Sequence, residues 1–567
     1  MVTLRQHLEK RYAQLQLGKS EWEGHWRELS RYLSPRTTRF IAGDRQAQGN
    51  KRYNDIIDST GTRALRTLVS GLVSGVTSPA RPWFQLKLLD RQMNSRGDVR
   101  WWLEAVRDIA LETFLKSNCY TMLPSVYGDL GGFGTSTLIP EPDPETVVRF
   151  RSLPLGSYCL GTDDTGRVNT CYREFQMTVA QLVSKFGKEN CSERVRSMWQ
   201  SGSTEAWIDV VHAIEPNADW DHQRSESKYK RFLSAYWEKG ASTLEHDGML
   251  SVRGFDEFPI IAPRWDVTGE DVYGSSPGML ALGDVKMLQL MQKRKLQALD
   301  KIVTPPMVAD VSLKNKRASL LPGDITYVND VSPGAGMRPA YQIVNFGFNE
   351  LLMDIQATQR SIDDVFFKDL FLMISQIERT GVTATEIAAR KEEKLMALGP
   401  VYMRLNDEML DQLVESTINR LFEEGMLPPP PPGVEGAPLS IEYVSVMAQA
   451  MKSIGVENIE RLMAFTGSVG SMFPKALHRV NADKVITRYA EMVGAPSDVL
   501  YDDEQVKAAA AAEDQQMRMA QMAELAGKGA AAAKDLGAAP TTGDNALANI
   551  VQAMRGAAPV SPVPGVQ

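Results

Sequence analysis

The sequence is poor in cysteine and histidine and contains no long hydrophobic run. Its four cysteines form no CxxC pair and no disulfide framework, so we expect reduced thiols buried as small apolar groups. Its six histidines are scattered, with no HExxH motif and no Cys/His ligand spacing. No stretch approaches the roughly 18 apolar residues that span a bilayer, and the N-terminal stretch is amphipathic and charged rather than a signal peptide. We expect a soluble protein from a reducing compartment, with no metal and no cofactor.

Signatures of ATP hydrolysis and of nucleophilic catalysis are absent as well. The glycine stretches 71–75 and 128–134 lack the Lys-Ser/Thr of a phosphate-binding loop, and we expect a tight turn at 131–134. No GxSxG elbow occurs. Adjacent carboxylates stand at 163–164, 363–364 and 502–503, but neighbours on a helix point apart. These absences argue against an enzyme.

The chain lacks the net positive charge that is typical of proteins that bind nucleic acid tightly. The chain has 567 residues, a formal net charge of -7, 43% hydrophobic and 23% charged residues. This composition predicts a large buried core and two to four domains rather than global disorder. A protein that neutralises many phosphates is normally basic. Any contact with DNA should therefore be loose or made through local patches.

The first half of the chain predicts helices followed by strands. Apolar spacing and cap residues predict helices at 4–17, 21–33, 64–76 and 101–116. From 140 to 174 the pattern changes to short apolar runs around Asp163-Asp164-Thr165-Gly166, which predicts a β-hairpin. A mixed region rich in Trp and Tyr continues to Asp266.

The middle of the chain predicts two long helices around a small insert. The helices are expected at 276–303, roughly 40 Å long, and at 349–371, and they could run antiparallel. The insert between them has strand-like runs and turn residues. A loop at 372–382 follows, and a T-x-x-E box at Thr383 and Glu386 opens a helix that continues past Pro400 toward Gly425.

The last part of the chain becomes progressively less patterned. Five prolines at 428–432 predict a stiff connector, and a strand is expected at 440–446. The Ala-rich segment to about residue 525 has helical propensity, and the rest is expected to be disordered in isolation.

Several segments, taken in order, resemble those of one known family. They are 53–55 (YND), 58–61 (DSTG), 78–84 (SPARPWF), 117–118 (SN), 130–135 (LGGFGT), 258–259 (FP), 264–265 (RW), 273–278 (YGSSPG) and 383–387 (TATEI) with Arg390 and Glu393. Each motif alone is common, and their joint order across roughly 50–490 is what makes the match specific. On these motifs the chain resembles the portal, or head-to-tail connector, proteins of short-tailed bacteriophages.

The resemblance implies an α+β, mainly helical portal fold in a ring-forming subunit, twelve-fold in the virion, around a DNA channel. It implies a wing at 1–275 and 383–440, stem helices at 276–303 and 347–371, a clip at 304–346 and a tunnel loop at 372–382. A crown would occupy 441–503, followed by the tail at 504–567.

The partners that the resemblance implies are those of a capsid vertex. They are double-stranded DNA bound without sequence specificity, a terminase motor that hydrolyses ATP, a tail adaptor, and the major capsid and scaffolding proteins. No membrane is involved. The implied location is the portal vertex of the virion, after assembly in the host bacterial cytoplasm.

Both long helices have a polar stripe beside an apolar one. On 276–303 the polar stripe is Lys286, Gln289, Lys293, Gln297 and Asp300, and the apolar stripe is Val285, Leu288, Leu299 and Ile302. On 349–371 small or charged residues recur at Asp354, Ala357, Ser361, Asp364 and Lys368, with Leu351, Ile355, Ile362 and Phe366 elsewhere. Repeated in a ring, such wet faces of mixed charge would form a channel wall, although ordinary solvated faces give the same pattern.

The candidate site residues follow from these stripes and from two loops. The channel candidates are Lys286, Lys293, Asp354, Asp364, Lys368, Arg379, Thr380 and Gly381, and the clip or docking candidates are Lys314, Lys316 and Arg317. In this hypothesis Arg379 touches the DNA backbone and Gly381 permits movement. A plain helix–helix turn and a solvated basic run are the respective alternatives.

Two other functions remain open at this point. A packaging-associated nuclease would use paired carboxylates such as Asp363 and Asp364, and metal-dependent cleavage would support it. A monomeric scaffold or internal virion protein that contacts the membrane would rest only on the Ala-rich tail. Alternatively, twelve copies of that tail could form a helical barrel, so deletion of 504–567 should leave ring assembly intact and alter packaging or genome retention.

Overall fold

The computed structural model divides into two units, Met1–Gly494 and Ala495–Gln567, and the first contains nearly all of what it describes. The described residues are 3–35, 55–90, 93–241, 248–305, 307–309, 337–339, 348–372, 384–453 and 456–473, with short pieces at 479–482, 484–486, 489, 515–520 and 522. Helices and strands are both present, as expected for an α+β protein. Within the described residues no helix is both long and apolar enough to cross a membrane.

The N-terminal helix is continuous, where the sequence predicted two. Helix α1 spans Leu4–Tyr32 and starts with a capping box between Thr3 and Gln6. The expected interruption near residues 18–20 is absent because Lys19 is anchored: its Nζ donates to the carbonyl of Gly156 at 2.9 Å and lies 3.3 Å from Glu23. Lys19 is therefore buried against partners within the fold, while Gly18 and Ser20 beside it remain exposed.

Three further helices and a two-stranded sheet form the helical part of the core. The expected helices at 64–76 and 101–116 are confirmed as α2 (Thr60–Gly75) and α3 (Gly97–Lys116), and α4 (Cys119–Phe133) follows. The predicted strand near 440 is β11 (Leu439–Tyr443), which pairs antiparallel with β1 (Phe84–Leu88). A short 3-10 turn, η2, covers Met93–Ser95.

The strands form one hairpin and a five-stranded antiparallel sheet. The hairpin pairs β2 (Leu138–Asp143) with β3 (Val147–Ser152). The sheet has the order β4-β5-β6-β7-β8, and its members are Tyr158–Thr162, Val168–Thr178, Trp207–Pro216, Phe232–Glu238 and Met249–Phe255. The predicted hairpin turn is confirmed, since the Asp163 carboxylate accepts from the backbone N–H groups of Thr165 and Arg167 at 2.9 Å each.

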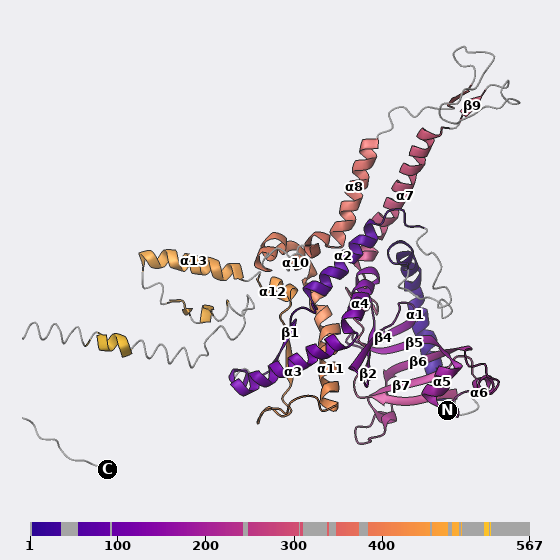
Figure 1. Cartoon of the computed structure of the whole chain (residues 1–567), viewed down its shortest axis with the longest axis horizontal. Coiled ribbons are helices and arrows are strands. Elements are labelled where there is room, and N and C mark those ends of the chain that lie inside the picture. Colours follow the sequence, from indigo (N-terminus) through magenta and orange to yellow (C-terminus); the bar gives the residue numbers. More distant parts are fainter. Residues whose placement is uncertain are drawn as a thin grey trace, which may run out of the picture. The chain divides into compact units, whose positions relative to one another are not determined.

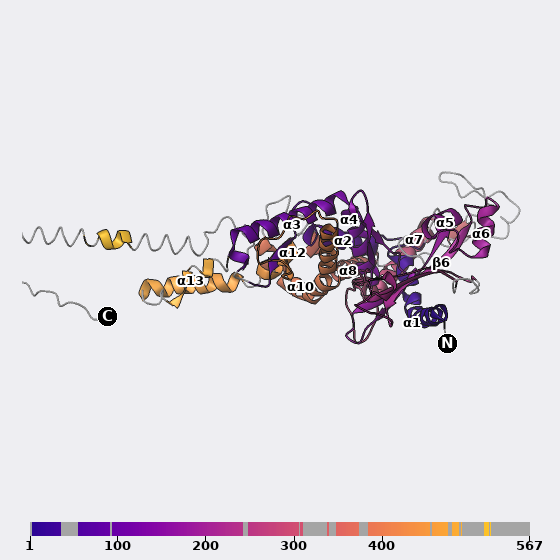
Figure 2. The ribbon, with the colours of Figure 1, turned by 90° about the horizontal axis from the view of Figure 1, so that it is seen from below.

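Helices cover both faces of the five-stranded sheet. On one face, Leu8 and Tyr12 of α1 pack with Tyr172 and Trp237 in one apolar cluster. On the other face lie α5 (Val179–Phe186) and α6 (Glu193–Gln200), with η3 (Ser227–Tyr229) before β7. Figure 2 shows α1 and the α5–α6 pair on opposite sides of β6. The sheet is thus the middle layer of a helix–sheet–helix arrangement.

The two long central helices are antiparallel, as the sequence predicted. Helix α7 spans Pro277–Val303 and α8 spans Phe348–Val365. Ser361 Oγ donates to Asp284 at 2.7 Å, and Thr358 Oγ1 lies 3.9 Å from Met291 Sδ. Residue numbers therefore increase along one helix while they decrease along the other. At the far end, β9 (Met307–Ala309) pairs with β10 (Met337–Pro339) (Figure 1). The rest of the insert lies outside the described residues.

The second long helix ends earlier than the predicted residue 371. After Val365 the chain turns at Phe367, whose φ is 52°, and helical structure resumes over 368–372. Phe366 and Phe371 are both fully buried. Residues five apart lie about 140° apart around a straight helix, so the turn is what lets both rings enter one core. The apolar pattern predicted the burial of these rings and not the break.

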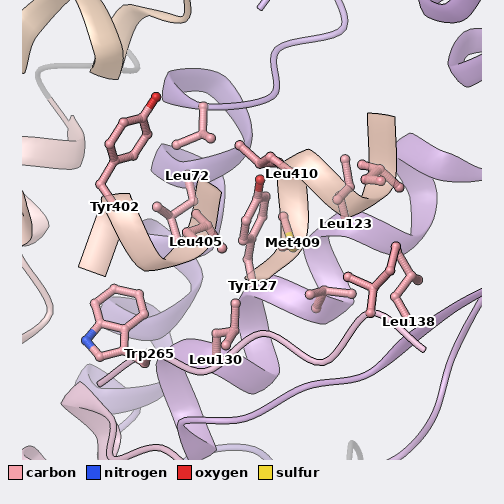
Figure 3. Packing of buried hydrophobic residues seen from close by; sticks show 14 of the residues in the cluster. Leu72, Leu123, Tyr127, Leu130, Leu138, Trp265, Tyr402, Leu405, Met409 and Leu410 are labelled. Carbon is pink, nitrogen blue, oxygen red and sulfur yellow. The ribbon is translucent and has the colours of Figure 1, made fainter. Parts of the chain in front are cut away.

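A long bent helical segment closes the helical core, as predicted. It consists of α10 (Ala384–Leu405), a π-helical turn (Asn406–Leu410) and α11 (Asp411–Glu423). In Figure 3, Leu405, Met409 and Leu410 from this bend pack beside Tyr127 and Leu130 of α4. Helices α12 (Val446–Ser453) and α13 (Val456–Met472) follow. Thr383 of the predicted capping box lies outside the described residues.

Candidate functional site

The base of α7 is built from glycines that bring two backbone segments into direct contact. We call Gly132, Gly134, Gly274 and Gly278 the glycine junction. Gly134 ends α4 with φ of 84°, and a Cβ there would lie 2.0 Å from the carbonyl oxygen of Gly274. A Cβ on Gly278 would lie 2.4 Å from the carbonyl oxygen of Gly132. Gly132 itself is helical, so the tight turn predicted for this glycine cluster occurs only at Gly134.

Hydroxyl groups lock the junction. Ser276 caps α7 by accepting from the Met279 N–H at 3.0 Å, and its Oγ donates to the carbonyl of Gly132 at 3.0 Å. Thr135 Oγ1 accepts from the Gly274 N–H at 2.8 Å. The start of α7 is therefore fixed to the end of α4 by both sterics and hydrogen bonds.

Asp58 ties both long helices to the start of α2. Its carboxylate accepts from the Thr60 N–H at 2.8 Å and from Gln292 and Gln359 Nε2 at 2.9 Å each. The amide of Gln289 completes the contact, accepting from the Asp58 N–H at 2.8 Å and donating to its carbonyl at 2.9 Å. Burial raises the pKa of Asp58, but the hydrogen bonds outweigh it and the pKa lies below its ordinary value.

Removal of this carboxylate should loosen the helix pair. We expect Asp58→Ala to lower the free energy of unfolding by about 2–3 kcal/mol, because several half-buried donors lose a charged acceptor. Since the pKa of Asp58 is lowered in the folded state, its contribution exists above the unfolded-state pKa and disappears as the pH falls through the lowered one. Urea titrations at pH 7 and at pH 3 should show the difference shrinking at the lower pH.

The control for this variant is Asp55→Ala. Asp55 pairs with Arg31 at 2.6 Å on the surface, where ion pairs contribute little. Equal losses in the two variants would contradict the assigned role of Asp58.

A buried ion pair joins the segment before α7 to the bent helical segment. Arg264 is 5% exposed and contacts Glu408, which lies in the π-helical turn, through Nη2 at 2.6 Å and Nε at 3.3 Å. The Arg264 N–H also donates to Glu408 at 2.9 Å, and Nη2 donates to the carbonyl of Gly166 at 2.8 Å. One side chain thus holds the β4–β5 turn, the approach to α7 and the bend between α10 and α11 together.

The predicted polar stripe of α7 divides into two environments. Gln289 does not belong to a wet face: it is 6% exposed because its amide binds the backbone at Asp58. Lys286 pairs with Glu28 of α1 at 3.0 Å and remains 42% exposed. Lys293 is exposed. Leu299 and Ile302 of the apolar stripe are 49% and 42% exposed in the single chain, because they lie on the distal part of the helix, away from the core.

The channel candidates of α8 and the segment after it are partly paired within the chain. Asp354 and Asp364 are exposed. Lys368 contacts Asp363 at 2.5 Å and is about one-third exposed. The remaining candidates, Arg379, Thr380 and Gly381 of the loop and Lys314, Lys316 and Arg317 of the insert, lie outside the described residues.

Comparisons with known proteins identify the family. The family model described as "Bacteriophage head to tail connecting protein" matches residues 5–500. This chain belongs to that family. It is 44% identical to the portal protein of Salmonella phage epsilon15 over 97% of this chain and 98% of the relative. It is 42% identical to the probable portal protein of Bordetella phage BPP-1 over 98% of this chain and 99% of the relative. The resemblance seen in the sequence is thereby confirmed, and the chain is a phage head-to-tail connector.

Solved structures add little to this assignment. The neck of an empty gene transfer agent particle aligns over 81% of this chain and 96% of its own, with 13% identity and a TM-score of 0.34. The assignment rests on the family model and on the two sequence relatives.

The anchoring contacts of this connector were invisible in its sequence. Arg264 was singled out only as part of a motif, and Glu408, Gln292 and Gln359 had no signal because they become neighbours only in the fold. The four cysteines are free and buried, as predicted. In the part of the chain that the structure describes, no three His, Cys, Asp or Glu side chains gather as a metal site.

A buried carboxyl lies beside the glycine junction of the connector. Asp129 of α4 is 2% exposed; its Oδ2 accepts weakly from Ser136 at 3.4 Å, and its Oδ1 has no hydrogen-bond partner. Burial raises the pKa of Asp129 well above its ordinary value. We therefore expect this carboxyl to stay protonated in the folded connector at pH values just above the ordinary pKa of aspartic acid, where an exposed Asp is already ionised.

This shift predicts a pH dependence of stability. Between the unfolded-state pKa near 4 and the raised folded-state pKa, the folded state binds the extra proton, so stability falls as the pH rises, by up to about 1.4 kcal/mol per pH unit. The Asp129→Asn variant has no carboxyl group at this position, so its stability lacks this pH-dependent contribution. In urea titrations, its stability relative to the unmodified chain should therefore improve as the pH rises above the ordinary pKa of aspartic acid. Parallel curves for the two proteins would show that Asp129 does not titrate abnormally.

Proposed function

We propose that the connector forms a ring at the portal vertex in which α7 and α8 surround a channel for double-stranded DNA during packaging and ejection. The observation that carries this proposal is the antiparallel α7–α8 pair. Its base is fixed by the glycine junction, Asp58 and the Arg264–Glu408 pair, while its distal part keeps charged and apolar side chains exposed. In a ring, neighbouring subunits can bury the apolar side chains that the distal part of the α7–α8 pair leaves exposed, while the base holds the pair in place.

The charges of the helix pair suit a channel through which DNA moves better than a site that binds DNA tightly. Helix α7 carries five basic and two acidic residues, and α8 carries one basic and four acidic residues. Rings that alternate such helices present mixed charge to DNA. A uniformly basic wall would neutralise phosphates and hold the duplex, because each neutralised phosphate adds affinity. The exposed members of the proposed channel face are Lys286, Lys293, Asp354 and Asp364.

We further propose that the connector has the regions of a portal subunit and the partners of a portal vertex. The wing is 1–275 with 383–440, the stem helices 276–303 and 347–371, the clip 304–346, the tunnel loop 372–382, the crown 441–503, and the tail 504–567. The ring has twelve subunits, is assembled in the host cytoplasm with capsid and scaffolding proteins, and docks a terminase and a tail adaptor through its clip. The terminase supplies ATP hydrolysis and the connector is not an enzyme; divalent-metal-dependent DNA cleavage by the purified connector would favour the nuclease alternative instead.

Thiol labelling tests the channel assignment. The four native cysteines are buried, so they give little background. A Lys293→Cys variant should react with a maleimide in empty particles and be protected in DNA-filled particles, because the duplex occupies the space beside α7. The control is Lys228→Cys on η3, an exposed position that should react equally in both. Equal labelling of Lys293→Cys with and without DNA would contradict the assignment.

A further inference from the structure

Arg173 is a buried cation that lacks a carboxylate partner. It lies on β5 and is 5% exposed. Its Nε donates to Nδ1 of His212 at 3.1 Å, and its Cζ lies 4.8 Å from the ring centroid of Phe175. Among the residues described by the structure, no carboxylate forms an ion pair with Arg173. A guanidinium removed from water without a counter-ion is costly, so this arrangement calls for an anion.

His212 holds the guanidinium in place and cannot neutralise it. Since Nδ1 accepts from Arg173, the ring proton is on Nε2, which lies 3.0 Å from Ser234 Oγ. The imidazole also stacks on Tyr236 with ring centroids 3.7 Å apart. Burial, and then the charges of Arg173 and Lys185, lower the pKa of His212 well below its ordinary value. A neutral histidine with one fixed tautomer leaves Arg173 oriented and its charge uncompensated.

More cations surround the same point. Lys185 of α5 lies 5.0 Å from the ring of Tyr236 and 5.5 Å from that of Phe186. Partial desolvation, and then the nearby charges of Arg173, Arg151 and Arg253, lower the pKa of Lys185. Glu141, whose charge opposes these cations at Lys185, is itself paired with Arg151 at 2.6 Å. This carboxylate is therefore already engaged by another cation.

Three members of this group lie side by side on one face of the sheet. Arg173, His212 and Tyr236 are directly opposite one another on β5, β6 and β7. On their face of the sheet, Cys171 and Ile214 belong to the main core cluster, whereas Val210 and the α5–α6 residues form a separate apolar cluster. The charged side chains occupy the seam between these two clusters. We call Arg173, Lys185, His212, Tyr236 and Arg253 the basic niche.

We propose that the basic niche binds a single small oxyanion. The guanidinium of Arg173 has N–H donors beyond Nε, Lys185 lies over the Tyr236 ring, and Arg253 lies opposite Ser234, which contacts His212. A phosphate-like group satisfies these donors and removes the uncompensated charge. The site lies on the sheet and not on the α7–α8 pair, so it is independent of the proposed DNA channel.

Inorganic phosphate is the probe that tests this site in the full-length protein. Calorimetric titration at constant ionic strength should show saturable binding of phosphate. Thermal unfolding should shift to higher temperature with phosphate and not with the same ionic strength of chloride. Lys185→Gln should weaken binding about tenfold, the loss of one charge-assisted contact, without unfolding the chain because Lys185 is on the exposed side of α5. Arg173→Met should abolish binding.

The matched control is Lys188→Gln, which removes an exposed lysine just beyond α5 and should bind phosphate as the unmodified chain does. The absence of saturable binding at millimolar phosphate would overturn the proposal. Equal weakening by Lys185→Gln and Lys188→Gln would also overturn it, because that result describes a general charge effect. If Arg173→Met does not fold, the comparison of the two lysine variants still decides the question.

Discussion

Gly278→Ala should destabilise the connector by at least about 2–3 kcal/mol, although alanine is the better helix former. The added methyl group would lie 2.4 Å from the carbonyl oxygen of Gly132 and 3.1 Å from the Gly132 Cα. Backbone atoms cannot rotate aside as a flexible side chain can. The start of α7 must therefore move away from α4, which also breaks the Ser276–Gly132 hydrogen bond. Urea unfolding followed by tryptophan fluorescence measures the loss.

The same substitution five residues further along α7 is the control. A Cβ on Gly283 meets nothing within 4 Å, so Gly283→Ala should leave stability unchanged or raise it by about 0.5–1 kcal/mol through helix propensity. Opposite signs for the two alanine variants would establish that close backbone approach, and not helix formation, governs position 278. Similar effects at both positions would contradict the glycine junction.

Arg264→Met should cost about 3–5 kcal/mol, since it leaves the half-buried Glu408 carboxylate without its bidentate partner. The carbonyl of Gly166 loses its donor as well. The cost should fall when Glu408→Leu is added, because the double variant no longer buries an unpaired charge. A double-mutant cycle in urea therefore predicts a loss for the double variant that is smaller than the sum of the single losses.

The control for this ion pair is Lys230→Ala, which breaks a surface pair with Asp256 at 2.7 Å. Exposed pairs contribute little to stability, so this variant should change the free energy of unfolding by less than about 1 kcal/mol. Additive losses in the Arg264–Glu408 cycle would show that the two side chains do not act as a unit.

Local patterns predicted several elements of this fold, but not α4, α5, α6 or the strands β6, β7 and β8. Apolar spacing located α2, α3 and α7, and turn residues located the β4–β5 hairpin at Asp163. These signals are local because a helix face or a turn is determined by residues close in sequence. The fused α1 and the early end of α8 were missed, since long-range contacts of Lys19 and of Phe366 decide them.

The anchorage of the helix pair could not be predicted from local patterns. Gln289 fits a polar stripe by spacing, yet the backbone at Asp58 draws it into the interior. Glu408 looked like one of many helix-surface acids until the fold placed it against Arg264. In both cases the partner is more than a hundred residues away, and spacing within one helix contains no information about it. The four glycines of the junction lie within two of the family motifs, 130–135 and 273–278, but neither motif predicted that the two segments meet.

Electron microscopy of the purified connector, combined with light scattering for its mass, tests the proposed ring and its DNA channel. We expect rings of about twelve subunits with a central hole, in which α7 and α8 line the hole and Lys293 and Asp354 face it. Rings in which the five-stranded sheet lines the hole, with the α7–α8 pair at the periphery, would contradict the proposed DNA channel.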